Sequence, residues 1–274
     1  MKGGAVRPVA SFLLKVRPNN HHHHRPIGET LSTRCYLARR NVNNKANINN
    51  NNNQPATTNE AKAEISPSNH GTKPLTSLLD MLTNKNNNKS SATVGNLQNY
   101  LQSNQLNQPT PIQAHTIPLL TANHDVMASA QTGSGKTLMF ALPLCQALMN
   151  VQQRQGNKKP AAIILNPTRE LALQTHEVIQ DILGNNDDRP GVIKTGVAVG
   201  GLHSLQRAQL QQCDILVATP GRLLQHVDER AISLQGTHFV VIDEADRMLD
   251  LGFEPQLRRI ARALGRRQQQ QQQQ

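Results

Sequence analysis

The sequence predicts an α/β fold, in which a parallel sheet is covered by helices on both faces. Short apolar runs alternate with helical patterns between about residues 105 and 265, as they do in repeated βαβ units. Polar or charged residues follow these runs, at the position where open α/β sheets bind their ligands. The runs are Val126–Ala130, 161–165, Ile215–Ala218 and Phe239–Ile242.

The first 40 residues are predicted to form a basic, disordered arm. Residues 1–58 contain nine Lys or Arg and a single acid, Glu29. Apolar residues are interleaved with the basic ones, although Pro8 weakens the amphipathic pattern, and the apolar stretch is too short to span a membrane. This composition favours an organellar transit peptide over a basic RNA-binding tail. Residues 34–36, Arg-Cys-Tyr, resemble a mitochondrial processing signal, which implies cleavage after Tyr36. A nuclear or cytoplasmic location is the alternative.

Residues 41–93 are predicted to be a disordered linker. Asn dominates residues 41–59 and recurs at 85–91. Such polar tracts bury too little apolar surface to offset chain entropy, and the Gln tail at 268–274 is of the same kind. The folded domain is therefore predicted to span residues 94–267.

Charge and cysteine content narrow the function only slightly. The net charge of +11 fits a polyanionic partner, but much of the excess lies in the arm. Cys35, Cys145 and Cys213 form no C-x-x-C pair, so neither a zinc site nor a disulfide framework is predicted. The four adjacent His residues at 21–24 lie among Asn and are typical of low-complexity sequence rather than of a metal site.

A glycine-rich segment, called the phosphate loop here, follows the first apolar run. Gly133 and Gly135 let successive N–H groups point at phosphate oxygens, and the following helix adds its positive dipole. We expect Lys136 to reach the β- and γ-phosphates and Thr137 to ligate Mg²⁺. A structural glycine turn is the alternative. The expected nucleotide-binding residues are Ala130, Gln131, Thr132, Gly133, Ser134, Gly135, Lys136 and Thr137.

An acidic cluster at 243–246 follows the last apolar run. A carboxylate there is expected to be exposed at the carboxyl end of a buried strand, where ligands bind. Asp243 can hold the hydration shell of Mg²⁺, and Glu244 can polarise the water that attacks the nucleotide. With Lys136 they form the predicted catalytic set. The alternative is the acidic first turn of a solvated helix.

The tetrapeptide Asp-Glu-Ala-Asp at 243–246 and its continuation to Phe253 resemble those of the DEAD-box RNA helicases. Residues 109–113, Pro-Thr-Pro-Ile-Gln, resemble the adenine-reading Q motif of that family, which implies that Gln113 binds the purine edge. The resemblance covers about residues 94–264. It implies a RecA-like P-loop NTPase domain that uses ATP and Mg²⁺ to unwind RNA.

Three further segments resemble the RNA-backbone motifs of this family: residues 167–172, 200–201 and 219–222. Two of them follow apolar runs, so they are expected on the same edge of the sheet as the phosphate loop. Hydroxyls, guanidinium groups and bare glycine backbone suit phosphate and sugar oxygens, which predicts binding to RNA without sequence preference. The implied RNA contacts are Thr168, Arg169, Gly201, Thr219, Gly221 and Arg222.

The chain departs from the family pattern in two places. Gln105 and Leu106 stand where a glycine and an aromatic residue are usual, and the region near Asn88 lacks the aromatic residue that stacks on adenine. Weak nucleotide binding is therefore expected. The pattern also stops after Arg267, before the Ser-Ala-Thr motif and the second RecA-like domain, so the chain resembles the first half of a helicase.

Two other function classes remain open at this point. One is a non-catalytic fragment that binds RNA or nucleotide. The other is a P-loop NTPase subunit completed by a partner chain. The sequence gives no indication of the oligomeric state.

Overall fold

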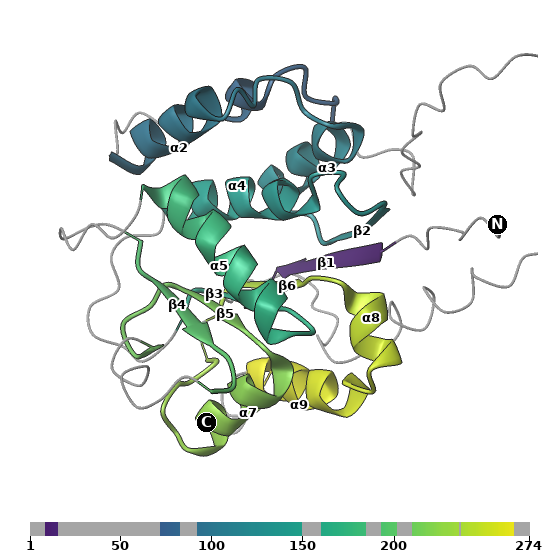
Figure 1. Cartoon of the computed structure of the whole chain (residues 1–274), viewed down its shortest axis with the longest axis vertical. Coiled ribbons are helices and arrows are strands. Elements are labelled where there is room, and N and C mark those ends of the chain that lie inside the picture. The colour runs from purple at the N-terminus through teal and green to yellow at the C-terminus, as the bar shows by residue number, and fades with distance from the viewer. Residues whose placement is uncertain are drawn as a thin grey trace, which may run out of the picture.

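A computed structural model of the protein describes residues 9–15, 72–82, 92–149, 160–184, 193–201, 210–235 and 237–265. Strands and helices alternate along the second half of the chain, which confirms the predicted α/β fold (Figure 1). The elements are β1 (Val9–Lys15), η2 (Leu78–Met81), α2 (Ala92–Ser103), α3 (Pro111–Thr121), β2 (Val126–Ala130), α4 (Lys136–Met149), β3 (Ala162–Leu165), α5 (Arg169–Leu183), β4 (Thr195–Ala198), β5 (Ile215–Ala218), α7 (Pro220–Asp228), β6 (Phe239–Ile242), α8 (Ala245–Asp250) and α9 (Glu254–Gly265).

The sheet has the order β2-β1-β6-β3-β5-β4. Strands β6, β3, β5 and β4 run parallel, and they end in one row because Leu165 lies opposite both Ile242 and Ala218, which in turn lies opposite Ala198. The residues that follow these strands therefore emerge along one edge of the sheet. This edge, called the carboxyl edge here, is where open α/β sheets bind ligands.

Helices cover both faces of the sheet, because side chains alternate between the faces along each strand. In β3, Ala162 and Ile164 pack into a core with α2, α3, α4 and α5. Its neighbouring residues Ile163 and Leu165 pack into a second core with α7, α8 and α9. Figure 1 shows these two helical layers on opposite sides of the sheet.

Part of the predicted linker is folded, contrary to the sequence-based expectation. Residues 72–82 include the short helix η2, in which Leu78 and Met81 are buried. The Met81 carbonyl also accepts a hydrogen bond of 2.6 Å from Gln146 Nε2 in α4. The apolar residues of this stretch supply burial that the Asn tracts lack. The tracts themselves and the Gln tail lie outside the described residues.

The arm also differs from its expected disorder, because Val9–Lys15 forms strand β1 inside the sheet. It runs antiparallel to both of its neighbours, β2 and β6. The remainder of the arm, including Tyr36 and the four His residues, lies outside the described residues.

Candidate functional site

The phosphate loop lies between the end of β2 and the start of α4, as the sequence predicts. Gly133 and Gly135 have φ values of 80° and 85°, in the left-handed region that side chains disfavour. Ser134, between them, has a buried hydroxyl oxygen without a hydrogen-bond partner in the described part of the chain. A curled backbone at a helix N-terminus with an unsatisfied polar atom is a fitting cradle for phosphate oxygens.

Lys136 is folded back over this loop. Its Nζ donates hydrogen bonds to the carbonyl oxygens of Ala130, at 2.8 Å, and Gln131, at 3.1 Å. The ammonium group is thus held at the loop, where exchanging carbonyl for phosphate oxygens needs only a side-chain movement. Thr137, the expected Mg²⁺ ligand, is half-buried in the first turn of α4.

Gln113, expected to read adenine, joins helix α3 to the phosphate loop. Its Oε1 accepts from the backbone N–H of Thr110 at 3.0 Å, and its Nε2 donates to the carbonyl of Gly135 at 3.0 Å. Thr110 Oγ1 adds a second link by donating to the carbonyl of Ser134 at 2.8 Å. Gln113 is buried, and these hydrogen bonds use both ends of its side-chain amide within the protein. Reading of adenine by Gln113 stays a prediction.

Asp243 directly follows β6 at the carboxyl edge. It is only 8% exposed, whereas the sequence predicted an exposed carboxylate. It is covered because its N–H still pairs with the Leu165 carbonyl at 2.9 Å and because Asn166 lies beside it. Asn166 Nδ2 donates to Asp243 Oδ2 at 3.3 Å and to Thr175 Oγ1 at 3.1 Å.

Asn166 was not identified from the sequence, although it follows an apolar run as Asp243 does. Its position directly after the apolar run 161–165 is the sequence signal that could have identified it. The two residues are brought together because Leu165 and Ile242 are register partners.

Glu244, the expected base, begins helix α8 in a left-handed conformation, with φ of 50° and ψ of 48°. Its Oε2 forms an ion pair of 3.2 Å with Arg247 Nη1, and its N–H donates to Asp243 Oδ1 at 3.0 Å. The two adjacent carboxylates therefore differ in their exposure to solvent: that of Asp243 is buried and that of Glu244 is half-buried. A left-handed conformation such as that of Glu244 costs about 1–3 kcal/mol and is often found at functional sites.

The expected RNA contacts Arg169 and Gly201 lie together at the carboxyl edge. Arg169 Nη1 donates to the carbonyl of Gly200 at 2.7 Å. Gly201 has φ of 80°, and a Cβ there would meet the Arg169 guanidinium. Thr168 caps α5, since its Oγ1 accepts from the N–H of Leu171 at 3.4 Å. The arginine side chain and the bare glycine backbone therefore form one surface.

Thr219, Gly221 and Arg222 lie at the start of α7, two strands away from Asp243 in the sheet order. The Thr219 N–H donates to the Ala198 carbonyl at 3.2 Å, which places it at the same edge. Arg222 Nη1 donates to Gln225 Oε1 at 2.5 Å, while its Nε is buried without a hydrogen-bond partner in the described part of the chain. The guanidinium is thus only partly satisfied by the protein.

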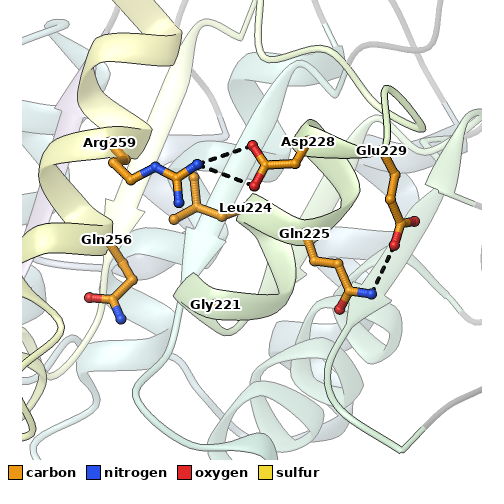
Figure 2. A pocket seen from close by; sticks show the side chains of 7 residues that line it. All are labelled: Gly221, Leu224, Gln225, Asp228, Glu229, Gln256 and Arg259. Carbon is orange, nitrogen blue, oxygen red and sulfur yellow. Dashed lines mark hydrogen bonds and ion pairs between the residues drawn. The ribbon is translucent and has the colours of Figure 1, made fainter.

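A pocket of about 540 Å³ lies between α7 and α9, beside Gly221 (Figure 2). Its charges are largely paired: Arg259 Nη2 lies 3.1 and 3.2 Å from the two carboxylate oxygens of Asp228, and Gln225 Nε2 donates to Glu229 Oε1 at 2.8 Å. None of its lining residues belongs to the phosphate loop or to the acidic cluster. The lining residues are Gly221, Leu224, Gln225, Asp228, Glu229, Gln256 and Arg259.

The two cysteines within the described residues take no part in the site. Cys145 and Cys213 are buried free thiols, and burial raises the pKa of each to about 12, so neither ionises near neutral pH. Among the described residues, no group of three or more His, Cys, Asp or Glu could hold a metal ion. Within the same residues, every helix is too short or too polar to span a membrane.

Comparison with known families gives a match over most of the folded part of the chain. The family model for DEAD/DEAH box helicases matches residues 110–274. The match includes the phosphate loop, the acidic cluster and all three segments expected to contact RNA.

One solved structure of a similar protein agrees with the fold, and a second is similar in sequence. A DEAD box protein from the hyperthermophile Methanococcus jannaschii is 32% identical, with a TM-score of 0.50 over 65% of this chain and 46% of that one. A hypothetical ATP-dependent RNA helicase from Sulfolobus tokodaii is 28% identical, with a TM-score of 0.47 over 61% of this chain and 46% of that one. The chain therefore spans less than half the length of these matched structures.

Proposed function

This chain belongs to the DEAD/DEAH box helicase family, and we propose that it is the ATP- and RNA-binding part of an ATP-dependent RNA helicase. The observation that carries the proposal is the shared edge of the sheet. The phosphate loop, Asp243 with Glu244, and the Arg169–Gly201 surface all lie at the carboxyl ends of strands. Nucleotide and RNA can therefore bind close enough for one to influence the other.

The residues present fit ATP with Mg²⁺. Gly133, Gly135 and the N-terminus of α4 offer backbone N–H groups to the phosphates, and Lys136 offers a mobile cation. Thr137 and Asp243 would hold Mg²⁺, which supplies charge neutralisation of the phosphates when bound. Glu244 would orient and polarise the attacking water, since its carboxylate is half-buried and is held by one ion pair.

RNA would be held by its backbone, without reading of sequence. Arg169, Arg222 and the glycine backbone of Gly201 and Gly221 present groups suited to phosphate and sugar oxygens. Aromatic residues make up 2% of the chain, so stacking on bases contributes little. Binding is therefore expected to fall steeply with salt, because phosphate contacts release counterions.

Hydrolysis is the activity that separates the proposal from its alternatives. ATP turnover by the purified chain, measured with and without RNA, should be lost in Lys136→Ala through loss of ATP binding. In Glu244→Gln it should be lost with ATP binding retained, because the phosphate loop is untouched. Lys73→Ala, an exposed lysine outside the site, serves as the matched control.

A result with equal ATP affinity in wild type and Lys136→Ala would contradict the site. Nucleotide and RNA binding without any turnover would favour the non-catalytic fragment. Turnover that appears only with a partner chain would favour an NTPase subunit, because an arginine finger supplied in trans raises such rates by about 10³–10⁵.

Unwinding of RNA is proposed for the whole helicase rather than for these residues alone. A strand-displacement assay on the 274-residue chain, run with and without ATP, is expected to show no ATP-dependent displacement. Closure of two domains on ATP is the step that this family uses to separate strands, and the sequence resembles one of those domains. ATP-dependent displacement by the chain itself would contradict this assignment.

A further inference from the structure

The side-chain amide of Asn166 lies between the expected Mg²⁺ carboxylate and helix α5. Its Nδ2 donates to Asp243 Oδ2 at 3.3 Å and to Thr175 Oγ1 at 3.1 Å, and all three residues are buried. The proposed function assigns no role to Asn166. A buried amide that touches the carboxylate can, however, control the direction in which that carboxylate points.

The main chain fixes Asn166 relative to Asp243. The Asn166 N–H donates to the Ala218 carbonyl of β5 at 3.0 Å, and the Asp243 N–H donates to the Leu165 carbonyl of β3 at 2.9 Å. The two residues directly follow Leu165 and Ile242, which are register partners. Their side chains therefore start from adjacent, hydrogen-bonded positions, and their contact needs no movement of the main chain.

The amide of Asn166 is used through its nitrogen. Reversing the amide would set its oxygen against a carboxylate oxygen of Asp243, and two acceptors repel each other. Asn166 Oδ1 is buried without a hydrogen-bond partner among the described residues, whereas Gln113 uses both ends of its amide. An amide that served packing alone would be expected to have both ends satisfied. The contacts of Asn166 therefore favour a role for its donor group.

Two donors hold the carboxylate of Asp243, one at each oxygen. Oδ2 accepts from Asn166, and Oδ1 accepts from the Glu244 N–H at 3.0 Å. A carboxylate offers about four lone pairs, so accepting these two hydrogen bonds is compatible with binding a cation. Mg²⁺ requires nearly octahedral coordination, which makes its binding sensitive to the direction of each oxygen ligand. Hydrogen-bond partners of a metal-binding carboxylate therefore influence its affinity for the metal.

We propose that Asn166 is a positioning residue, which holds the Asp243 carboxylate in the orientation that binds the Mg²⁺ of a bound nucleotide. The contact with Thr175 fixes the amide from helix α5, and the contact with Asp243 passes this fixed direction to the carboxylate. Asn166 acts through Asp243 and needs no contact with metal or nucleotide. The proposal rests on the proposed function, because it requires Asp243 to belong to a Mg²⁺–nucleotide site.

Metal affinity tests this role without a measurement of turnover. A non-hydrolysable ATP analogue is kept bound by an excess of the purified full chain. Mn²⁺ is then titrated in place of Mg²⁺, and free Mn²⁺ is followed by its electron paramagnetic resonance signal. Asn166→Leu keeps the number of side-chain heavy atoms but removes the donor, so the dissociation constant of Mn²⁺ should rise by about 10–100-fold. Asn166→Ala should have the same effect.

Two controls separate positioning from general damage to the domain. In EDTA, calorimetry should give the same analogue affinity for wild type, Asn166→Leu and Asn166→Ala, because the phosphate loop is unchanged. Thr175→Val is the matched control, since it removes the second contact of the amide and keeps the donor that faces Asp243. It should weaken Mn²⁺ binding much less than Asn166→Leu does.

A measurement on the wild-type protein decides the matter if the Asn166 variants do not fold. The side-chain amide resonance of Asn166 should shift when Mg²⁺ is added to isotope-labelled protein with bound analogue. The reason is that the metal withdraws charge from the carboxylate that the amide faces. A resonance that does not move would overturn the proposal.

The remaining outcomes distinguish this proposal from the proposed function. Unchanged Mn²⁺ binding in Asn166→Leu, equal weakening in Thr175→Val, or an equal loss of analogue affinity in EDTA would overturn the positioning role alone. A wild-type chain that binds no analogue, or no metal together with it, would overturn the proposed nucleotide site and the positioning role with it.

Discussion

Asn166 and Asp243 are neighbours across two strands: each directly follows the last residue of its strand, and Asn166 Nδ2 donates to Asp243 Oδ2 at 3.3 Å. Asn166 is fully buried, and its Nδ2 also donates to Thr175 Oγ1. One amide therefore connects the expected Mg²⁺ carboxylate to helix α5. That helix begins at Arg169, so the residues expected to bind nucleotide and those expected to bind RNA are joined by a buried contact.

Replacing Asn166 is predicted to destabilise the domain. Asn166→Ala leaves a buried carboxylate and a buried hydroxyl short of a hydrogen bond, which should lower the free energy of unfolding by about 1–3 kcal/mol. Thr175→Val, which removes only the second contact, should cost less. Denaturant unfolding of both variants checks this, and equal losses would mean that the contact to Asp243 contributes nothing.

Gly135 and Gly133 are predicted to differ in their tolerance of a side chain. Both have positive φ, but a Cβ on Gly135 would meet the Gln113 amide, whereas a Cβ on Gly133 would meet no atom within 4 Å. Gly135→Ala should therefore lower the unfolding free energy by about 1 kcal/mol more than Gly133→Ala, which carries the backbone strain alone. Thermal unfolding of the pair measures the difference, and identical losses would contradict the Gln113 contact.

Glycine is predicted to be more stable than alanine in place of Glu244, the N-cap residue of α8. Its φ of 50° strains any residue with a Cβ, so Glu244→Gly should be more stable than Glu244→Ala by about 1 kcal/mol. Both variants lose the carboxylate and its ion pair to Arg247, so the comparison isolates the backbone. Chemical denaturation gives the two values, and a more stable Ala variant would show that the residue is unstrained.

Arg169 is predicted to contact an RNA phosphate. Arg169→Gln should weaken RNA binding for all sequences and reduce the magnitude of the slope of log K against log salt by about 0.7 for single-stranded RNA. Arg230→Gln, on the exposed turn after α7, is the matched control. Titrations at several salt concentrations give the slopes, and an unchanged slope for Arg169→Gln would place the RNA elsewhere.

Much of the site could be predicted from the sequence because its parts are local. The phosphate loop needs two glycines between a strand and a helix, and Gly133 and Gly135 adopt the left-handed conformations that such a loop requires. The four apolar runs became strands, with the expected residues following them. In each case the deciding interactions join residues a few positions apart, so a short stretch of sequence holds the information.

Tertiary structure alone decided which of these parts touch. Asn166 meets Asp243 across 77 residues, and β1 reaches β2 across more than a hundred, because strand pairing depends on register and on which edges are open. The sequence of Val9–Lys15 was compatible with a basic arm as well as with a strand. The tertiary structure places this segment between β2 and β6, where an extended apolar segment gains main-chain hydrogen bonds that an isolated arm cannot form.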